Sequence, residues 1–253
     1  MDLQLDGLRA LVTGGTKGIG KATVDMLADE GVSVAFCART DSDVRNTVDE
    51  LAQRKGRVLG AAVDVADRDD LTGWVERSAD ELGGIDIVVA NVSALAIGPT
   101  EQHWQTSFQV DLMHTVRLVE AAMPHLERSE SPSVIAVSSV SGRETDFAAP
   151  AYGPMKAAIV HYTHSLACQL AGKGIRANSV SPGNTFFPGG VWNRIEHDNP
   201  ELYREALALN PTGRMAEPRE IAYAVTMLAS PLASFITGTN LLADGALSRG
   251  IQL

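Results

Sequence analysis

Cysteine is scarce in this chain. Among its 253 residues only Cys37, in an expected strand, and Cys168, in an expected helix, carry thiols. This distribution favours two buried thiols over a disulfide. Histidine is also sparse, and only His161 and His164 lie close together in the sequence. We expect that pair on a helix surface or in a subunit contact, and we expect no metal site.

Basic charge and long apolar runs are also lacking. The 31 acidic residues outnumber the 21 basic ones and give a formal net charge of −10. This balance argues against nucleic acid or an anionic membrane as a partner. No apolar run reaches the ~18 residues of a membrane span, and the opening MDLQLDGLRALVTGG has no basic signal-peptide region. We expect a cytoplasmic protein that binds small molecules.

What the chain does contain is a regular alternation of strand and helix patterns. Short apolar runs recur at LRALVTGG, VSVAFCA, RVLGAAVDV, IDIVVANVS, SVIAVSSVSG, IRANSVSPG and TGTNLLADG, mostly separated by segments of helical spacing. Such a rhythm is typical of a parallel sheet covered on both faces by helices. We predict a single α/β domain over 1–253, with a substrate lid at about 184–215 beyond the carboxyl end of a strand.

The first expected strand leads into a glycine-rich turn, TGGTKGIG, at 13–20. Glycines allow a backbone to approach a pyrophosphate, whose charge then faces the N-terminus of the following helix. The spacing G-x-x-x-G-x-G differs from the common G-x-G-x-x-G fingerprint. From these residues alone, a nucleotide-binding turn is favoured and a purely structural bend stays open.

A second pattern, APAYGPMKAAIVHY, places Tyr152 and Lys156 four residues apart at the start of an expected helix. Pro154 fits only the first helical turn, and positions i and i+4 share a helix face. An ammonium near the phenol favours the phenolate, so we expect Lys156 to lower the pKa of Tyr152 toward the range useful for proton transfer.

Together, TGGTKGIG and YGPMK resemble the classical short-chain dehydrogenase/reductase family, and the likeness covers essentially the whole chain. Further matches follow in the family's order at Asp64-Val65, ANVS (90–93), VSSVSG (137–142), IRANSVSPG (175–183) and TGTNLLADGA (237–246). The resemblance implies a Rossmann-type, doubly wound fold with a seven-stranded parallel sheet flanked by helices. It also implies NAD(P)-dependent interconversion of a secondary alcohol and a ketone, and commonly a homotetramer.

By this resemblance, Tyr152 is the acid/base, Lys156 also holds the nicotinamide ribose, and Ser139 donates a hydrogen bond to the substrate oxygen. Asn91 braces the sheet near the cofactor, and Asp64 accepts from the adenine amino group. The implied cofactor-binding residues are Gly14, Thr16, Lys17, Gly18, Ile19, Gly20, Arg39, Thr40, Asp64, Val65, Asn91, Tyr152, Lys156, Pro182, Gly183 and Thr185.

Three residues depart from the family pattern. Ser93 replaces a glycine, and Phe187 replaces a threonine of the nicotinamide clamp. Asp111 stands where the family has an asparagine as its fourth catalytic residue. We expect Asp111 to keep the main-chain role in a proton relay, while its charge makes Tyr152 less acidic. An alternative reading is a catalytically degenerate nucleotide-binding module with a regulatory or structural role.

The cofactor prediction is NADP(H), with NAD(H) possible. The second expected strand, VSVAFCART, lacks the terminal acid that selects NAD. Arg39 and Lys17 could instead flank a 2′-phosphate, with Thr40 donating a hydrogen bond.

The substrate is expected to be a small-molecule ketone or alcohol. Phe147, Phe186, Phe187 and Trp192 suggest a bulky apolar or aromatic group, although ordinary lid packing explains them equally well. Arg143 and Arg194 are alternative contacts for an anionic group. The helices that hold FQVDLMHTVRLVEAAM and MKAAIVHYTHSLACQLA are apolar over more than one face, which predicts subunit contacts in a tetramer.

Overall fold

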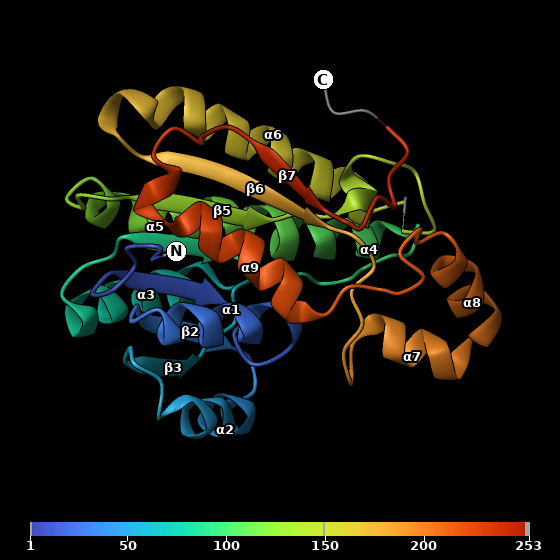
Figure 1. The fold of residues 1–253 in the computed structure, drawn as a ribbon, viewed down its shortest axis with the longest axis horizontal. Coiled ribbons are helices and arrows are strands. Elements are labelled where there is room, and N and C mark those ends of the chain that lie inside the picture. Colours follow the sequence, from blue (N-terminus) through green and yellow to red (C-terminus); the bar gives the residue numbers. More distant parts are fainter. Residues whose placement is uncertain (1, 149, 251–253) are drawn as a thin grey trace.

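Seven parallel strands form one sheet in the order β3-β2-β1-β4-β5-β6-β7 (Figure 1). The structure is a computed structural model that describes residues 2–148 and 150–250. The strands are β1 Arg9–Thr13, β2 Ser33–Ala38, β3 Val58–Ala62, β4 Ile87–Ala90, β5 Ser133–Val137, β6 Arg176–Pro182 and β7 Asn240–Ala243. The predicted doubly wound α/β fold with a seven-stranded parallel sheet is confirmed.

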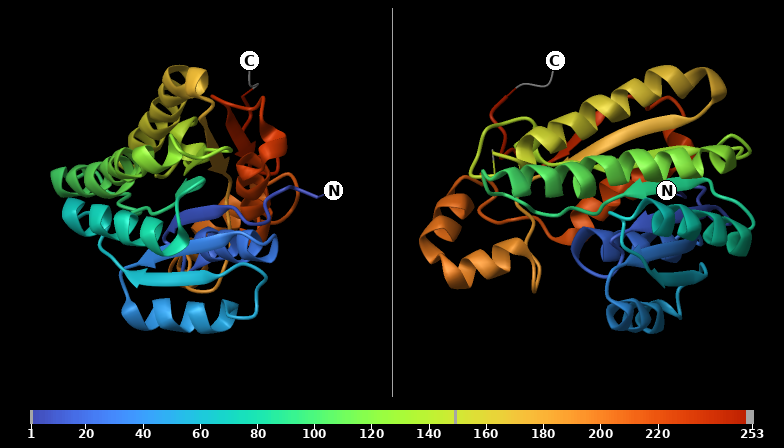
Figure 2. Two further views of the ribbon diagram at one scale, coloured as in Figure 1. Left: turned by 90° about the vertical axis from the view of Figure 1, so that its left-hand side faces the viewer. Right: turned by 180° about the vertical axis from the view of Figure 1, so that it is seen from behind.

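Helices cover both faces of this sheet, as Figure 2 shows from two sides. One face packs against α3, α5 and α6, and the other against α1, α2 and α9. The helices are α1 Gly18–Asp29, α2 Asp41–Leu51, α3 Arg68–Leu82, α4 Glu101–Ser107, α5 His114–Leu126, α6 Tyr152–Leu170, α7 Val191–Asp198, α8 Pro200–Ala208 and α9 Pro218–Ala229.

Most strand side chains are apolar on both faces of the sheet because each face belongs to a separate core. In β1, Leu11 packs into the core under α3, α5 and α6. Its neighbours Ala10 and Val12 pack into the core under α1, α2 and α9. Successive side chains of a strand point to opposite faces, so a doubly covered strand shows the continuous apolar run seen in the sequence.

All strands of a parallel sheet end at the same edge, and the connecting loops that carry polar residues gather there. The α7–α8 segment extends beyond this edge (Figure 1) and has a small core of its own around Trp192, Ala206 and Met215. An isolated bridge between Thr185 and Ala216 joins the two ends of the segment.

The structure corrects one expectation about the thiols. Cys37 is buried in β2, but Cys168 lies exposed on the solvent side of α6, where its Sγ is 3.7 Å from His164 Nε2. His161 and His164 are both exposed on α6, as expected for a helix surface. None of the described helices is long and apolar enough to cross a membrane.

Candidate active site

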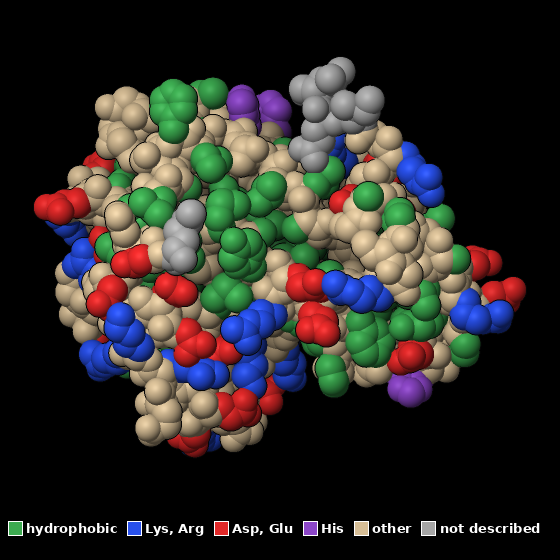
Figure 3. Space-filling view, in the orientation of Figure 1, with side chains coloured by type: hydrophobic (Ala, Val, Ile, Leu, Met, Phe, Trp, Pro, Cys, Tyr) green, Lys and Arg blue, Asp and Glu red, His purple; other side chains and the backbone are tan. Residues whose placement is uncertain are grey.

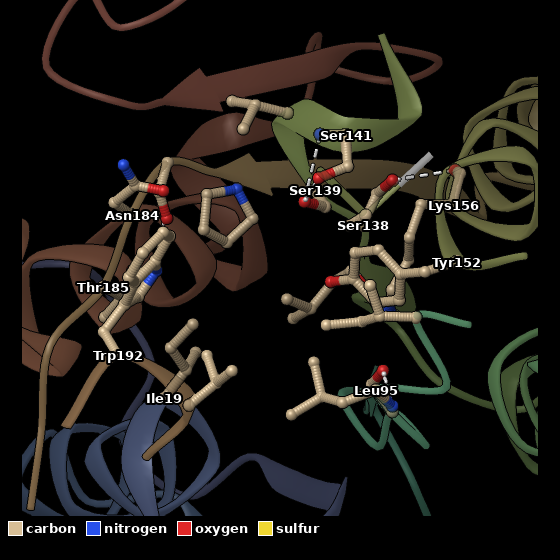
Figure 4. A pocket seen from close by; sticks show the side chains of 18 of the residues that line it. Ile19, Leu95, Ser138, Ser139, Ser141, Tyr152, Lys156, Asn184, Thr185 and Trp192 are labelled. Carbon is tan, nitrogen blue, oxygen red and sulfur yellow. Dashed lines mark hydrogen bonds between the residues drawn. The ribbon is translucent and has the colours of Figure 1, made fainter. Parts of the chain in front are cut away.

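A cavity of about 260 Å³ opens at the carboxyl edge of the sheet, between α1, α6 and the α7–α8 segment (Figure 4). Its wall brings together residues from opposite ends of the sequence. Of the predicted site residues, those that line it are Lys17, Ile19, Gly20, Asn91, Ser139, Phe147, Tyr152, Lys156, Pro182, Gly183, Thr185, Phe187 and Trp192. Phe186 instead packs edge-on against Tyr203 inside the α7–α8 segment. Neither Arg143 nor Arg194 lines the cavity.

Tyr152 and Lys156 occupy the first two turns of α6, on the side that faces the cavity. Lys156 is buried, its ammonium donates to the Val137 carbonyl at 3.1 Å, and Nζ lies 5.4 Å from the centre of the Tyr152 ring. Ser138, the residue before Ser139, anchors this turn by donating to the main-chain carbonyl of Lys156 at 2.8 Å. The helix therefore holds the phenol and the ammonium on one wall together with Ser139.

The net effect on Tyr152 differs from the sequence expectation. Burial raises the pKa of Tyr152, and this outweighs the charge of Lys156 and the hydrogen bond with Ser139, which both lower it. The negative charges of Asp111 and Asp146 raise it further. Lys156 thus acts in the predicted direction, but the predicted net lowering is wrong for this structure because burial disfavours the phenolate more strongly.

Asp111 is fully buried and faces Lys156. Its Oδ1 lies 3.4 Å from Lys156 Nζ, without a hydrogen bond to it among the described residues, and its Oδ2 accepts from the main-chain N–H of Ala94 at 3.4 Å. The segment Phe108–Met113 is a π-helical turn, a distortion often found at functional sites. The main-chain carbonyl of Asp111 accepts from the Thr115 hydroxyl at 2.9 Å.

His114, a residue that the sequence reasoning did not single out, lies buried three residues after Asp111. Burial and the nearby charge of Lys156 lower the pKa of His114 to about 3, so the ring is neutral. Its Nδ1 is 3.1 Å from the Val110 carbonyl, which can only accept, so Nδ1 carries the hydrogen. Nε2 then accepts from the Thr13 hydroxyl at 2.9 Å. The sequence feature that could have identified His114 is its position three residues after Asp111 in DLMH, because residues at this spacing lie close together on a helix.

The Thr13 hydroxyl also fixes Asn91. It accepts from the Asn91 main-chain N–H at 3.0 Å, and the Asn91 side chain donates to the Thr13 carbonyl at 3.1 Å. These bonds join the ends of β1 and β4, which supports the bracing role expected for Asn91.

The glycine turn fits a bound dinucleotide. A Cβ on Gly20 would lie 2.0 Å from the Gly14 carbonyl oxygen, so only glycine allows this close approach. Helix α1 begins at Gly18 without a side-chain hydrogen bond at its N-cap, Lys17. Main-chain N–H groups at the start of α1 thus remain to bind an anion such as a pyrophosphate.

The residues predicted to contact the adenosine half follow β2 and β3. Arg39 and Thr40 are exposed directly after β2, and Asp64 is exposed after β3, while Val65 is buried. Lys17 forms an ion pair with Asp43 of α2 at 2.8 Å, which offsets part of its charge. Thr16 belongs to the turn between β1 and α1.

Phe187 and Ser93, which depart from the family pattern, both lie at the cavity. The ring of Phe187 packs over the glycine turn, since a Cβ on Gly18 would lie 2.6 Å from it. The Ser93 hydroxyl lines the cavity and accepts from the Leu95 N–H at 3.1 Å. Thr185 is buried beside the cavity, and its hydroxyl donates to the Gly183 carbonyl at 3.1 Å.

Comparison with known proteins assigns this arrangement to a family. A family model described as enoyl-(acyl carrier protein) reductase matches residues 14–248. Isoepoxydon dehydrogenase patN of Penicillium expansum is 42% identical over 252 residues, which cover 98% of this chain and 97% of that protein. The chain belongs to the short-chain dehydrogenase/reductase family. As a family member it is an oxidoreductase that acts on CH–OH groups with a nicotinamide cofactor.

Other members of the short-chain dehydrogenase/reductase family agree in sequence and fold. The 3-oxoacyl-[acyl-carrier-protein] reductase FabG of Vibrio cholerae is 32% identical over 249 residues, covering 97% of this chain and 99% of that protein. A crystal structure of a putative short-chain dehydrogenase/reductase from Burkholderia xenovorans has a TM-score of 0.91 at 29% identity, covering 98% and 99% of the two chains. A 7α-hydroxysteroid dehydrogenase complexed with NADH and 7-oxo glycochenodeoxycholic acid has a TM-score of 0.90 at 25% identity, covering 97% and 96%.

The buried aspartate leads to a pH-dependent prediction. Because the charge of Asp111 raises the pKa of Tyr152, the variant Asp111→Asn should lower that pKa. With Tyr152 as the expected base, alcohol oxidation requires its phenolate, so kcat/KM should reach its plateau at a pH lower than in the native protein by on the order of one unit. The measurement is the pH profile of kcat/KM for one alcohol.

The matched control is Asp80→Asn, which removes an exposed carboxylate of α3. Its profile should overlay that of the native protein. Superimposable pH profiles of kcat/KM for the Asp111→Asn variant and the native protein would reject the effect of the Asp111 charge. A large loss of rate throughout the pH range would instead show that Asp111 has a role in turnover that asparagine cannot replace.

Proposed function

We propose that the protein is an NADP(H)-dependent oxidoreductase that interconverts a secondary alcohol and a ketone, with Tyr152 as the acid/base. The observation that supports this proposal is the convergence of Ser139, Tyr152 and Lys156 on one cavity that begins at the glycine turn. The similarity to isoepoxydon dehydrogenase supports alcohol–ketone chemistry.

In ketone reduction, the bound cofactor supplies the hydride that reaches the carbonyl carbon. Tyr152 donates its phenolic proton to the carbonyl oxygen, and Ser139 donates a hydrogen bond to the same oxygen as negative charge develops there. Lys156 stabilises the phenolate left on Tyr152, and Asp111 balances the buried ammonium at 3.4 Å. The reverse sequence oxidises the alcohol.

Replacing Tyr152 with phenylalanine tests this assignment. The variant keeps the ring but has no proton to donate, so kcat/KM should fall by at least about 100-fold. Cofactor affinity should change little. Turnover is followed at the nicotinamide absorbance with a panel of ketones and alcohols, and binding of the cofactor is followed by calorimetry.

Two outcomes would contradict the proposal. Equal turnover by the native protein and the Tyr152 variant would exclude the tyrosine as acid/base. Cofactor binding without turnover on a broad panel would favour the alternative, a nucleotide-binding regulatory or structural module.

The preference for NADP(H) over NAD(H) rests on the exposed Arg39 after β2. Helix α2 begins at its N-cap Thr40 without a side-chain hydrogen bond, so the Thr40 hydroxyl can donate to a 2′-phosphate. The variant Arg39→Asp should shift the ratio of kcat/KM toward NAD(H) by at least about tenfold, because a carboxylate repels the phosphate.

The control for that substitution is Arg128→Asp, the same charge change at an exposed residue after α5. It should leave the cofactor ratio of the native protein unchanged. The preference would be overturned if the native protein had a kcat/KM with NADP(H) equal to or below that with NAD(H). It would also be overturned if Arg39→Asp left the ratio of these two values unchanged.

We further propose a homotetramer in which the α7–α8 segment, about 184–215, acts as a substrate lid in each subunit of a single-domain, cytoplasmic protein. Large apolar side chains are exposed on α4 and the following turn, at Trp104 and Phe108. Others lie on and after α9, at Tyr223 and Phe235. In Figure 3 apolar side chains gather over α9 and the adjacent strands, while charged ones gather around α2.

Association would remove these apolar side chains from water. Light scattering at micromolar concentration should give about four times the chain mass of 26.8 kDa. A mass near that of a single chain would contradict the proposed assembly.

A further inference from the structure

One side of the cavity carries a chain of hydrogen bonds that leads from Ser139 to Asp146, a carboxylate with no role in the proposed chemistry. The Ser139 hydroxyl donates to Ser141 Oγ at 3.2 Å, and the Ser141 hydroxyl donates to Asp146 Oδ2 at 2.6 Å. Asp146 Oδ1 accepts from the Ala148 N–H at 2.8 Å. Figure 4 shows Ser139 and Ser141 side by side above the cavity. These hydrogen bonds hold the Asp146 carboxylate in a fixed position near Ser139, on the side of the cavity where the reacting oxygen is expected.

Asp146 is the one carboxylate among the described residues that line the cavity. The cations of the cavity wall have other partners, since Lys17 pairs with Asp43 at 2.8 Å and Lys156 with Asp111 at 3.4 Å. Within 2–148 and 150–250 no cation forms an ion pair with Asp146. Each carboxylate oxygen can accept two hydrogen bonds and receives one from the protein. Acceptor capacity therefore remains at the cavity.

The rest of the outer wall is apolar. Leu95, Ile97 and Val191 line it, and the rings of Phe147 and Trp192 meet edge-on with centres 5.4 Å apart. These side chains offer no hydrogen bonds through their alkyl groups and ring faces. This part of the cavity suits the carbon skeleton of a substrate, and Asp146 offers an acceptor for a polar group.

We propose that Asp146 is a specificity-determining residue that accepts a hydrogen bond from a second hydroxyl group of the substrate. The inference rests on the proposed alcohol–ketone chemistry, because Ser139 marks the position of the reacting oxygen. Two hydrogen bonds, of 3.2 Å and 2.6 Å, connect Ser139 Oγ with the carboxylate through Ser141. The second hydroxyl therefore lies on one of the two carbons that follow the reacting carbon.

The charges around the cavity favour a neutral hydroxyl over other polar groups. An anionic group would face the carboxylate, and like charges in a partly desolvated site repel. An ammonium would bring a second cation near Lys156, which already stands at the reacting end. A hydroxyl donates to the carboxylate without adding charge.

The test measures binding without turnover. The whole protein is saturated with NADPH or NADH, whichever binds more tightly, and titrated calorimetrically with cyclohexanol, 1,2-cyclohexanediol and 1,3-cyclohexanediol. Alcohol and reduced cofactor cannot react with each other, so the complexes are stable. At least one diol should bind about tenfold more tightly than cyclohexanol, the ratio expected for a hydrogen bond to a charged group.

The variant Asp146→Asn keeps the size of the side chain. In this variant the affinities for the diol and for cyclohexanol should differ by no more than about twofold. The matched control is Glu144→Gln on the same loop. The Glu144 carboxylate accepts from the Arg249 N–H at 2.9 Å and does not line the cavity. This control should keep the native ratio.

Equal affinities of the native protein for cyclohexanol and both diols, including no measurable binding of any, would overturn the proposal. So would a ratio that Asp146→Asn leaves unchanged. Tighter binding of 2-aminocyclohexanol than of either diol would assign the position to a cationic group instead. Because the assay needs no turnover, these failures are distinct from failure of the Tyr152 test.

Discussion

Burial of both faces of the parallel sheet is the constraint on which the rest of the molecule depends. The separate cores around α3, α5 and α6 and around α1, α2 and α9 fill most strand positions with apolar side chains, although β6 also buries Asn178, Ser179 and Ser181. The loops that follow the strands carry further polar residues, and the parallel arrangement gathers the carboxyl ends at one edge. The glycine turn after β1, Asn91 after β4 and Ser139 after β5 consequently meet at one cavity.

Within that cavity, the buried ammonium of Lys156 determines much of the electrostatics. Removing a charge from water is costly unless partners replace the hydration, and here the Val137 carbonyl and Asp111 do so. The same ammonium helps to keep His114 neutral and opposes the rise in the pKa of Tyr152 caused by burial. Asp111, which stands where the family has an asparagine, thus adds a negative charge 3.4 Å from the Lys156 ammonium.

The residues that line the cavity are of two kinds, polar and apolar. The wall formed by β5 and α6 holds the hydroxyl groups and the lysine that can move or stabilise a proton. Other lining residues, among them Leu95 and Trp192, are apolar and suit a carbon skeleton. Asp146 also lines the cavity and accepts from the Ser141 hydroxyl, and no family motif in the sequence marks it. In the proposed role, this carboxylate gives the site a means of selecting among ketones of similar size.

The sequence by itself determined the fold class and identified many of the residues that line the cavity. Continuous apolar strand runs and the motifs TGGTKGIG and YGPMK are local signals, and local spacing is enough to place Tyr152 and Lys156 on one helix face. Even the electrostatic direction of the Lys156 effect followed from that spacing. Signals of this kind need no knowledge of what lies across the sheet.

Only the tertiary structure decided the features that depend on contacts between distant segments. The net pKa shift of Tyr152 reflects burial, which a sequence motif does not reveal. The exposure of Cys168 depends on which face of α6 meets the sheet. The pairing of Lys17 with Asp43 and the position of Phe187 over Gly18 likewise require segments far apart in the sequence to meet. The pKa, the exposure and the contacts of a side chain depend on residues that are close in space but distant in sequence, so only the fold determines them.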